Sequence, residues 1–150
     1  MCLFALIDDI WIENFYTMIA LPPDQKTVVY ELSNSTLWMD EDGILWSVSK
    51  KAPPQTVEQA HKDMEKLRSL VGNKKVCLLA DVTHSTEISR EMREFAAAEL
   101  PKIIKAIAMV SGSSLGKMFA NIFFRLKTQP YPVKMFNHVE DARKWLLQYV

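Results

Sequence analysis

The sequence predicts a single α/β domain in which strands and helices alternate along most of the chain. Two apolar runs without polar alternation, residues 76–80 and 106–110, are typical of strands covered on both faces, as in a parallel sheet. Apolar stripes with helical spacing lie between and after them, and the right-handed crossover rule packs such helices against one sheet. The length of 150 residues fits one domain, because a chain of this size buries about 70% of its unfolded surface.

Before the first of these runs, the sequence predicts an antiparallel hairpin. Residues 28–32, 36–39 and 44–49 have the composition of strands. The acidic turn from Asp40 to Gly43 separates the last two of them. We therefore expect a mixed sheet that begins with this hairpin and continues with mostly parallel strands.

Four helices are predicted after the hairpin. Thr56 and Gln59 form a capping box for the first, which stops at Gly72, and the second begins near Ser89. The third follows residues 111–113, and Asn137 with Glu140 is expected to cap the fourth, after a strand at 133–136. The apolar stripes of the four are, in order, Val57, Ala60, Met64, Leu67 and Val71; Met92, Phe95, Ala96 and Leu100; Leu115, Met118, Phe119, Ile122, Phe123 and Leu126; and Val139, Ala142, Trp145, Leu146 and Tyr149.

Residues 1–23 predict an additional amphipathic helix, which precedes a domain at 27–150. Asp8, Asp9 and Glu13 fall mostly on its polar side, and the stretch has neither Lys nor Arg. A signal peptide needs a basic start, and carboxylates oppose a spanning helix, so neither secretion nor membrane insertion is expected. The apolar side of the helix consists of Leu3, Phe4, Ile7, Ile10, Trp11, Phe15 and Met18.

Charge and cysteine usage narrow the classes of partner and cofactor. Lys plus Arg and Asp plus Glu each total 18, so no net field attracts nucleic acid. Cys2 and Cys77 lie far apart, and the three histidines show no metal-ligand spacing. We therefore expect no nucleic acid, no metal and no cofactor, and a reducing, cytoplasmic environment.

Four stretches together resemble a known family. They are residues 31–33 with 37–44, residues 106–111, residues 121–124, and residues 131–136 with Ala142, Trp145 and Leu146. They are similar to a bacterial family of small uncharacterised proteins with a STAS-like fold, the fold of anti-sigma-factor antagonists, which is distantly similar to the lipid-binding CRAL-TRIO domain. The resemblance runs from about Val29 to Tyr149, leaves out the N-terminal helix, and implies a fold without an activity.

The loop after the predicted central strand is a candidate switch. STAS regulators carry a phosphorylatable Ser in an Asp-Ser-x-Gly type motif there, and this chain departs from that motif in the region of Asp81, His84, Ser85, Thr86 and Ser89. A phosphate near a helix N-terminus is electrostatically favourable. An N-cap accounts for the same residue types more simply. The intact mass of protein from its native host decides between them, because a wholly unmodified population under several growth conditions contradicts the switch.

A second candidate site follows residues 106–110. Ser111, Gly112, Ser113, Ser114 and Lys117 lead from a buried strand into a helix, where backbone N–H groups and Lys117 could bind an anion. Three residues rather than four separate Gly112 from Gly116, and Met118 replaces the hydroxyl that would hold magnesium in a phosphate-binding loop. An ordinary strand-to-helix turn with a Ser cap is the simpler interpretation.

The sequence offers a weak candidate for catalysis and a candidate apolar interface. Asp81, His84 and Ser85 lie within five residues, and side chains on one short loop rarely converge into a triad, so no catalytic residue is assigned. Phe124 projects away from its helix stripe, and with Ile7, Trp11 and Phe15 it forms a candidate interface. The N-terminal helix either docks on its own domain or forms a homodimer, and both arrangements stay open.

The sequence therefore favours a non-enzymatic STAS-like regulatory or protein-interaction module. The alternative is a domain that binds a small apolar or anionic ligand, lipid-like or nucleotide-like. A partner module should expose an apolar surface without a pocket, whereas a ligand domain should have an enclosed cavity near His84 or near Ser111 to Lys117.

Overall fold

The computed structural model describes residues 27–125 and 128–150, without the side chains of residues 123–125. The predicted N-terminal helix, with Ile7, Trp11 and Phe15, and the side chain of Phe124 lie outside this part of the chain. Within it, no helix is both long enough and apolar enough to cross a membrane.

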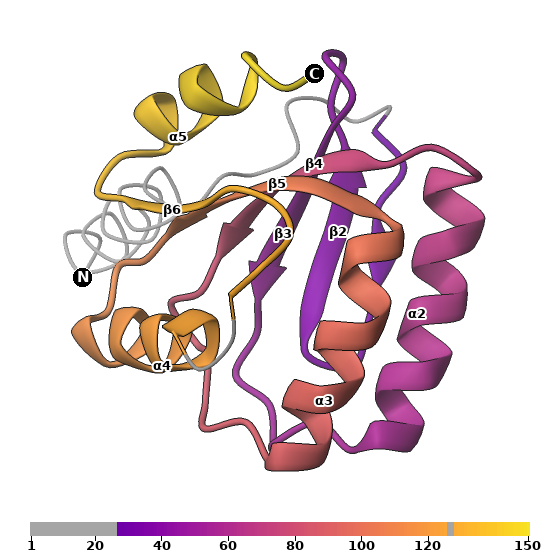
Figure 1. Ribbon diagram of the computed structural model, residues 1–150, viewed down its shortest axis with the longest axis vertical. Coiled ribbons are helices and arrows are strands. Elements are labelled where there is room, and N and C mark those ends of the chain that lie inside the picture. Colours follow the sequence, from indigo (N-terminus) through magenta and orange to yellow (C-terminus); the bar gives the residue numbers. More distant parts are fainter. Residues whose placement is uncertain (1–26, 126–127) are drawn as a thin grey trace, which may run out of the picture.

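The described chain forms one mixed sheet of six strands with helices on both faces (Figure 1). The strands are β1 (Tyr30–Glu31), β2 (Ser35–Met39), β3 (Ile44–Ser49), β4 (Val76–Asp81), β5 (Ile104–Val110) and β6 (Val133–Phe136), and they lie side by side in this order. The pairs β1–β2 and β2–β3 are antiparallel, and β3 to β6 are parallel. The predicted hairpin and the parallel sheet after it are confirmed, although β1 is shorter than the expected 28–32.

Asp40 shapes the turn between β2 and β3. One carboxylate oxygen accepts hydrogen bonds from the backbone N–H groups of Asp42 and Ile44, at 3.0 and 2.9 Å, and the other accepts from Trp46 Nε1 at 2.9 Å. Gly43 has a φ of +78°, a conformation that few other residues adopt. The turn residues of the sequence thus act as predicted, and Asp40 also orients a core tryptophan.

Within the described residues, three helices cover one face of the sheet and one helix covers the other. They are α2 (Val57–Val71), α3 (Arg90–Glu99), α4 (Ser114–Arg125) and α5 (Val139–Leu146), with a short 3-10 helix at Leu100–Lys102 after α3. Each crossover from β3 to β6 moves in the same direction across the sheet, so α2, α3 and α4 share one face. The chain then turns back, and α5 lies on the opposite side (Figure 1).

The two faces bury separate cores. On the side of α2 to α4, the core includes Leu45, Met64, Ile104 and Ile107. On the side of α5, Trp38 stacks on Trp46 with ring centroids 5.7 Å apart, and the same core holds Cys77 and Leu146. Burial raises the pKa of the Cys77 thiol, which favours its neutral form.

The caps of α2 and α3 agree with the sequence, and the cap of α5 does not. Thr56 and Gln59 form the predicted capping box of α2, and Ser89 Oγ accepts a hydrogen bond from Met92 N at the start of α3. The prediction for α5 is wrong, because its N-cap is His138, which makes no side-chain capping bond. Asn137 instead accepts a hydrogen bond from Lys117 Nζ at 3.0 Å.

The predicted core stripe of α4 is wrong at three positions. Leu115, Met118 and Ile122 are 57%, 47% and 47% exposed, whereas Gly116 and Ala120 are buried. A Cβ atom on Gly116 would overlap the carbonyl oxygen of Val82 and lie 2.9 Å from that of Thr83. The helix therefore approaches the end of β4 through its small residues, which turns these three large residues outward.

Replacement of Gly116 tests this close approach. Gly→Ala inside a helix ordinarily stabilises by about 1 kcal/mol. Here the methyl group meets backbone rather than a flexible side chain, so Gly116→Ala is expected to lower the free energy of unfolding by about 2 kcal/mol. Gly112→Ala is the matched control, because its Cβ would meet only Thr83 side-chain atoms at 3.6 and 3.8 Å. Urea unfolding measures both, and an unchanged midpoint for Gly116→Ala would contradict the packing.

Tyr131 provides a pH test of the core. Its hydroxyl is buried with no hydrogen-bond partner among the described residues, and burial raises the pKa of Tyr131 to about 12, from 10.0. Stability that depends on the neutral phenol is thus complete below pH 10 and is lost as the pH rises through 12. Tyr131→Phe should raise the free energy of unfolding by about 1 kcal/mol at pH 7 and weaken the loss between pH 10 and 12. Urea unfolding across that range measures it, and a destabilised variant would show that the hydroxyl has a partner.

Candidate functional site

The loops at the carboxyl ends of the parallel strands meet at one edge of the sheet. Residues 82–89 follow β4, residues 111–113 follow β5 and residues 50–56 follow β3. Gly112 N donates to Thr83 Oγ1 and His84 N donates to Ser49 Oγ, both at 2.9 Å. Ligands of open α/β sheets bind at this kind of edge, so it is the candidate functional site.

Asp81 fixes the direction in which the chain leaves β4. It is buried, and its Oδ1 accepts a hydrogen bond from Thr83 N at 2.8 Å. The backbone continues the sheet for one more residue, since Val82 N donates to the carbonyl oxygen of Val110 at 2.8 Å. Asp81 therefore has a structural partner in the turn that it begins.

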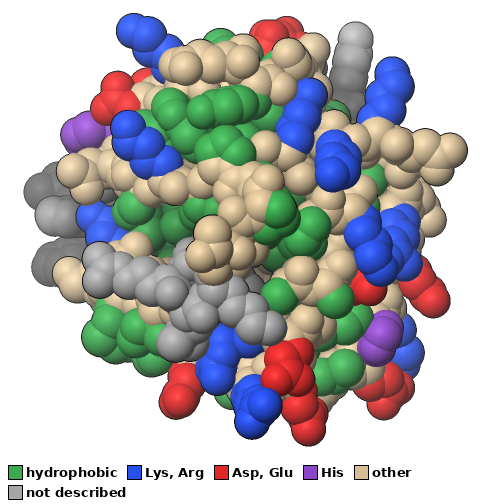
Figure 2. Space-filling model, in the orientation of Figure 1, with side chains coloured by type: hydrophobic (Ala, Val, Ile, Leu, Met, Phe, Trp, Pro, Cys, Tyr) green, Lys and Arg blue, Asp and Glu red, His purple; other side chains and the backbone are tan. Residues whose placement is uncertain are grey.

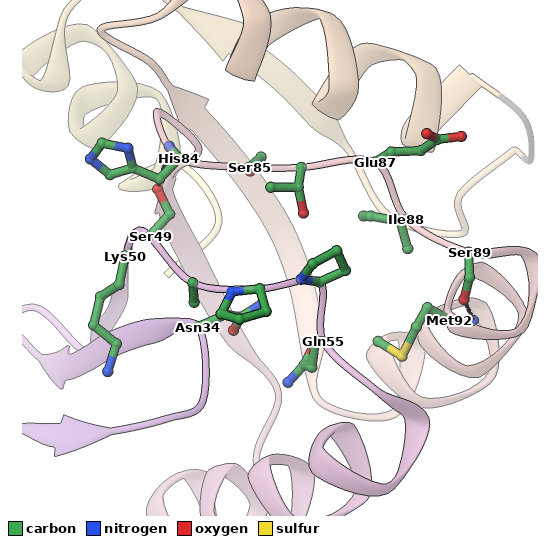
Figure 3. A pocket seen from close by; sticks show the side chains of 14 residues that line it. Asn34, Ser49, Lys50, Gln55, His84, Ser85, Glu87, Ile88, Ser89 and Met92 are labelled. Atoms are coloured by element: carbon green, nitrogen blue, oxygen red, sulfur yellow. Dashed lines mark hydrogen bonds between the residues drawn. The ribbon is translucent and has the colours of Figure 1, made fainter.

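His84 does not join Asp81 and Ser85 in a triad. Among the described residues, its imidazole makes no hydrogen bond with either of them, and Figure 3 shows the ring at one end of the site, pointing away from Ser85. A general base must reach the proton that it removes. The loop therefore lacks the geometry for nucleophilic catalysis by these three residues.

The hydroxyl groups of the loop fall into two groups. Ser89 Oγ accepts from Met92 N at 3.2 Å and is the N-cap of α3. The side chains of Ser85 and Thr86 make no hydrogen bond within the described chain, and Thr86 is exposed. The structure thus shows that Ser89 acts as the N-cap of α3. Ser85 and Thr86 remain the candidate switch residues.

The loop from Ser111 to Lys117 uses most of its donors internally. Ser113 N donates to Ser111 Oγ at 3.0 Å, and Gly116 N donates to Ser113 Oγ at 3.2 Å, as for an N-cap. Lys117 Nζ is bound to Asn137. The backbone N–H groups of residues 112, 113, 116 and 117 already have acceptors, so an anion here would meet only those of Ser114 and Leu115.

A small cavity of about 140 Å³ lies between the loop after β3 and the loop after β4. Figure 3 shows Ile88 and Met92 pointing into this space, whereas the carboxylate of Glu87 points outward. Lys50 Nζ, at the edge of the cavity, donates to Glu31 Oε2 at 2.6 Å and to the carbonyl oxygen of Leu32 at 2.8 Å. The hydrogen bond from Lys50 to Glu31 lowers the pKa of Glu31. The one lysine of the cavity wall is thus already paired.

Sequence reasoning missed part of this site. Asn34, Ser49, Lys50 and Gln55 line the cavity, and they come from segments that precede the predicted central strand. Buried Asp63 on α2 holds two of these segments together, because it accepts from Ser33 N at 3.0 Å and from Gln55 Nε2 at 2.7 Å. The register of β2 on β3 brings Asn34 to the carboxyl edge, where its carbonyl oxygen accepts a hydrogen bond from Lys50 N at 2.9 Å.

The described side chains form no cluster of metal ligands. Within that part of the chain, no three His, Cys, Asp or Glu residues lie close enough to hold a metal ion. His61 and His138 are both exposed, and His61 packs edge-on against Phe95 at 4.5 Å between ring centroids.

Comparison with known families identifies the domain. Residues 37–150 match the model of the family described as "Domain of unknown function (DUF7793)". The chain belongs to the DUF7793 family. The match begins within β2 and includes the loops after β3, β4 and β5.

Solved structures similar to this DUF7793 chain include two proteins without an established function, and no curated protein matches its sequence. One is an uncharacterized protein of the DUF3478 family with a SpoIIAA-like fold, from Shewanella loihica PV-4. It is 15% identical with a TM-score of 0.49, over 85% of this chain and 99% of that chain. The other is a protein with unknown function from Arthrobacter sp. FB24, 27% identical with a TM-score of 0.27, over 73% and 90% of the two chains.

The cap at Ser89 is directly testable in this DUF7793 domain. Ser89→Ala should lower the free energy of unfolding by about 1 kcal/mol, because Met92 N loses its acceptor, whereas Ser89→Asp should retain the cap. Ser85→Ala is the matched control and should change stability by less than about 0.5 kcal/mol. Thermal and urea unfolding give these values, and equal effects at Ser85 and Ser89 would contradict the assignment.

Proposed function

We propose that this domain is a non-enzymatic, STAS-like regulatory module that acts by protein–protein contact, with the outer side of α4 as its docking surface. The observation that carries the proposal is the exposure of Leu115, Met118 and Ile122. Their spacing of three and four residues places them in one row along the helix. We call this row the α4 stripe.

The α4 stripe differs from incidental apolar exposure. The other large apolar side chains that are exposed in the described chain, Val28, Val29, Leu147 and Val150, lie near its two ends. Single exposed apolar residues are common, whereas a contiguous row on a folded helix marks an interaction surface. Hydrophobic side chains reach the molecular surface in several places on the side of α2 to α4 (Figure 2).

The residues around the α4 stripe indicate the chemistry of the partner. Between Ser114 and Ile122 the one charged residue is Lys117, and its ammonium group is bound to Asn137. Ser114 and Asn121 are exposed and uncharged. Such a surface suits an apolar groove or an amphipathic helix of another protein.

The position of the candidate switch supports regulation of the same surface. Thr83 bonds to Gly112, and Gly116 lies against the carbonyl oxygens of Val82 and Thr83. A phosphate on Ser85 or Thr86 would add negative charge within a few residues of these contacts. This arrangement supports control of α4 by the loop after β4.

The α4 stripe can be tested by comparison of two variants in the native host. The variant Leu115→Ser, Met118→Ser, Ile122→Ser should lose a partner that cross-links to the unmodified protein, while its stability changes by less than about 1 kcal/mol because these side chains are already exposed. The matched control, Val28→Ser with Leu147→Ser, should retain the partner. Cross-linking with quantitative mass spectrometry measures this, and equal recovery of all partners by both variants would rule the surface out.

A further inference from the structure

The two faces of the central strand β4 are covered unequally. Cys77 and Leu79, which point toward α5, are 0% and 1% exposed. Leu78, Ala80 and Val82, which point toward α2 to α4, are only half-buried. Because β4 lies between β3 and β5 inside the sheet, this exposure reflects a gap in the helical layer rather than a sheet edge.

The gap is a cavity of about 170 Å³ between β4, β5, α4 and the segment around α3. Its floor includes Leu78 and Ala80 from β4 with Ile107 and Met109 from β5, and its walls include Leu100 and Phe119. Charged side chains are absent from the lining, which consists entirely of described residues.

The position of α4 explains why the cavity exists. Gly116 brings the start of α4 onto the backbone at Val82 and Thr83, whereas α3 packs beside α2. In Figure 1, α2 and α3 run side by side, and α4 lies apart from them and across their direction. Small residues, Ala80 and Ala120, face the resulting space and do not fill it.

From this geometry we infer that the cavity is a binding site for one small, uncharged aromatic molecule with at most one hydrogen-bonding group. An apolar cavity of about 150 Å³ in another protein stays dry and binds a benzene-sized ligand, so the volume here suits a single ring. A charged ligand would lose its hydration without compensation from the apolar lining.

The mouth of the cavity determines where the one polar group of the ligand lies. Ser85 and Thr86 are the two hydroxyl side chains of the lining, and neither makes a side-chain hydrogen bond within the described chain. A phenol-like hydroxyl can meet them while the ring lies over Ala80. This inference does not depend on the α4 stripe, whose side chains point outward from the same helix.

Methyl NMR on the full chain tests the site with phenol and benzoate as matched probes. Phenol should shift the methyl signals of Ile107 and Met109 with one common dissociation constant, whereas benzoate, of similar size but charged, should not. Absence of saturable shifts at these two residues up to the solubility of phenol would overturn the inference.

Two alanine variants make the test specific. Ala80→Leu places a side chain in the cavity and should weaken phenol binding at least tenfold, whereas Ala98→Leu on the exposed side of α3 should change it less than twofold. If Ala80→Leu does not fold, Ala80→Val provides the same test with a smaller loss. Unchanged binding to a folded Ala80 variant would overturn the site, and Met118→Ser, which tests the α4 stripe, should leave phenol binding intact.

Discussion

Gly116 lies so close to the carbonyl oxygens of Val82 and Thr83 that a side chain of any size would displace α4. This contact places the start of α4 directly on the loop after β4, and the hydrogen bond from Gly112 to Thr83 joins the two loops at the same point. Two features follow from it. Leu115, Met118 and Ile122 of α4 face solvent, and the space between α4 and α3 is left unfilled.

The sheet itself could be predicted from local signals. The Asp40–Gly43 turn, the Thr56 capping box and the unbroken apolar run of β4 each depend on residues close together in the sequence, and each takes the expected form. The burial of α4 could not be predicted by the same means, because the helical period shows which residues share a face but not which face turns inward. Gly116 and Ala120, four residues apart, were the available signal, since small residues at this spacing permit a close approach.

The candidate site was predictable only in part, for a related reason. The loop after β4 is predictable because open α/β sheets bind ligands at that edge. The residue types of Ser85, Thr86 and Ser89 indicate an N-cap but do not show which of the three supplies it. The opposite wall, from Asn34 to Gln55, depends on a long-range register that places Ser35 beside Ser49. Nothing in the local sequence around Asp63 indicates that its carboxylate joins Ser33 to Gln55.

Ser85, Thr86 and Ile88 line both the cavity beside His84 and the cavity over Ala80. The segment between β4 and α3 is thus a partition one chain thick, and a displacement that enlarges the space on one side reduces it on the other. A change of side chain at Ser85, Thr86 or Ile88 therefore alters the walls of both spaces at once.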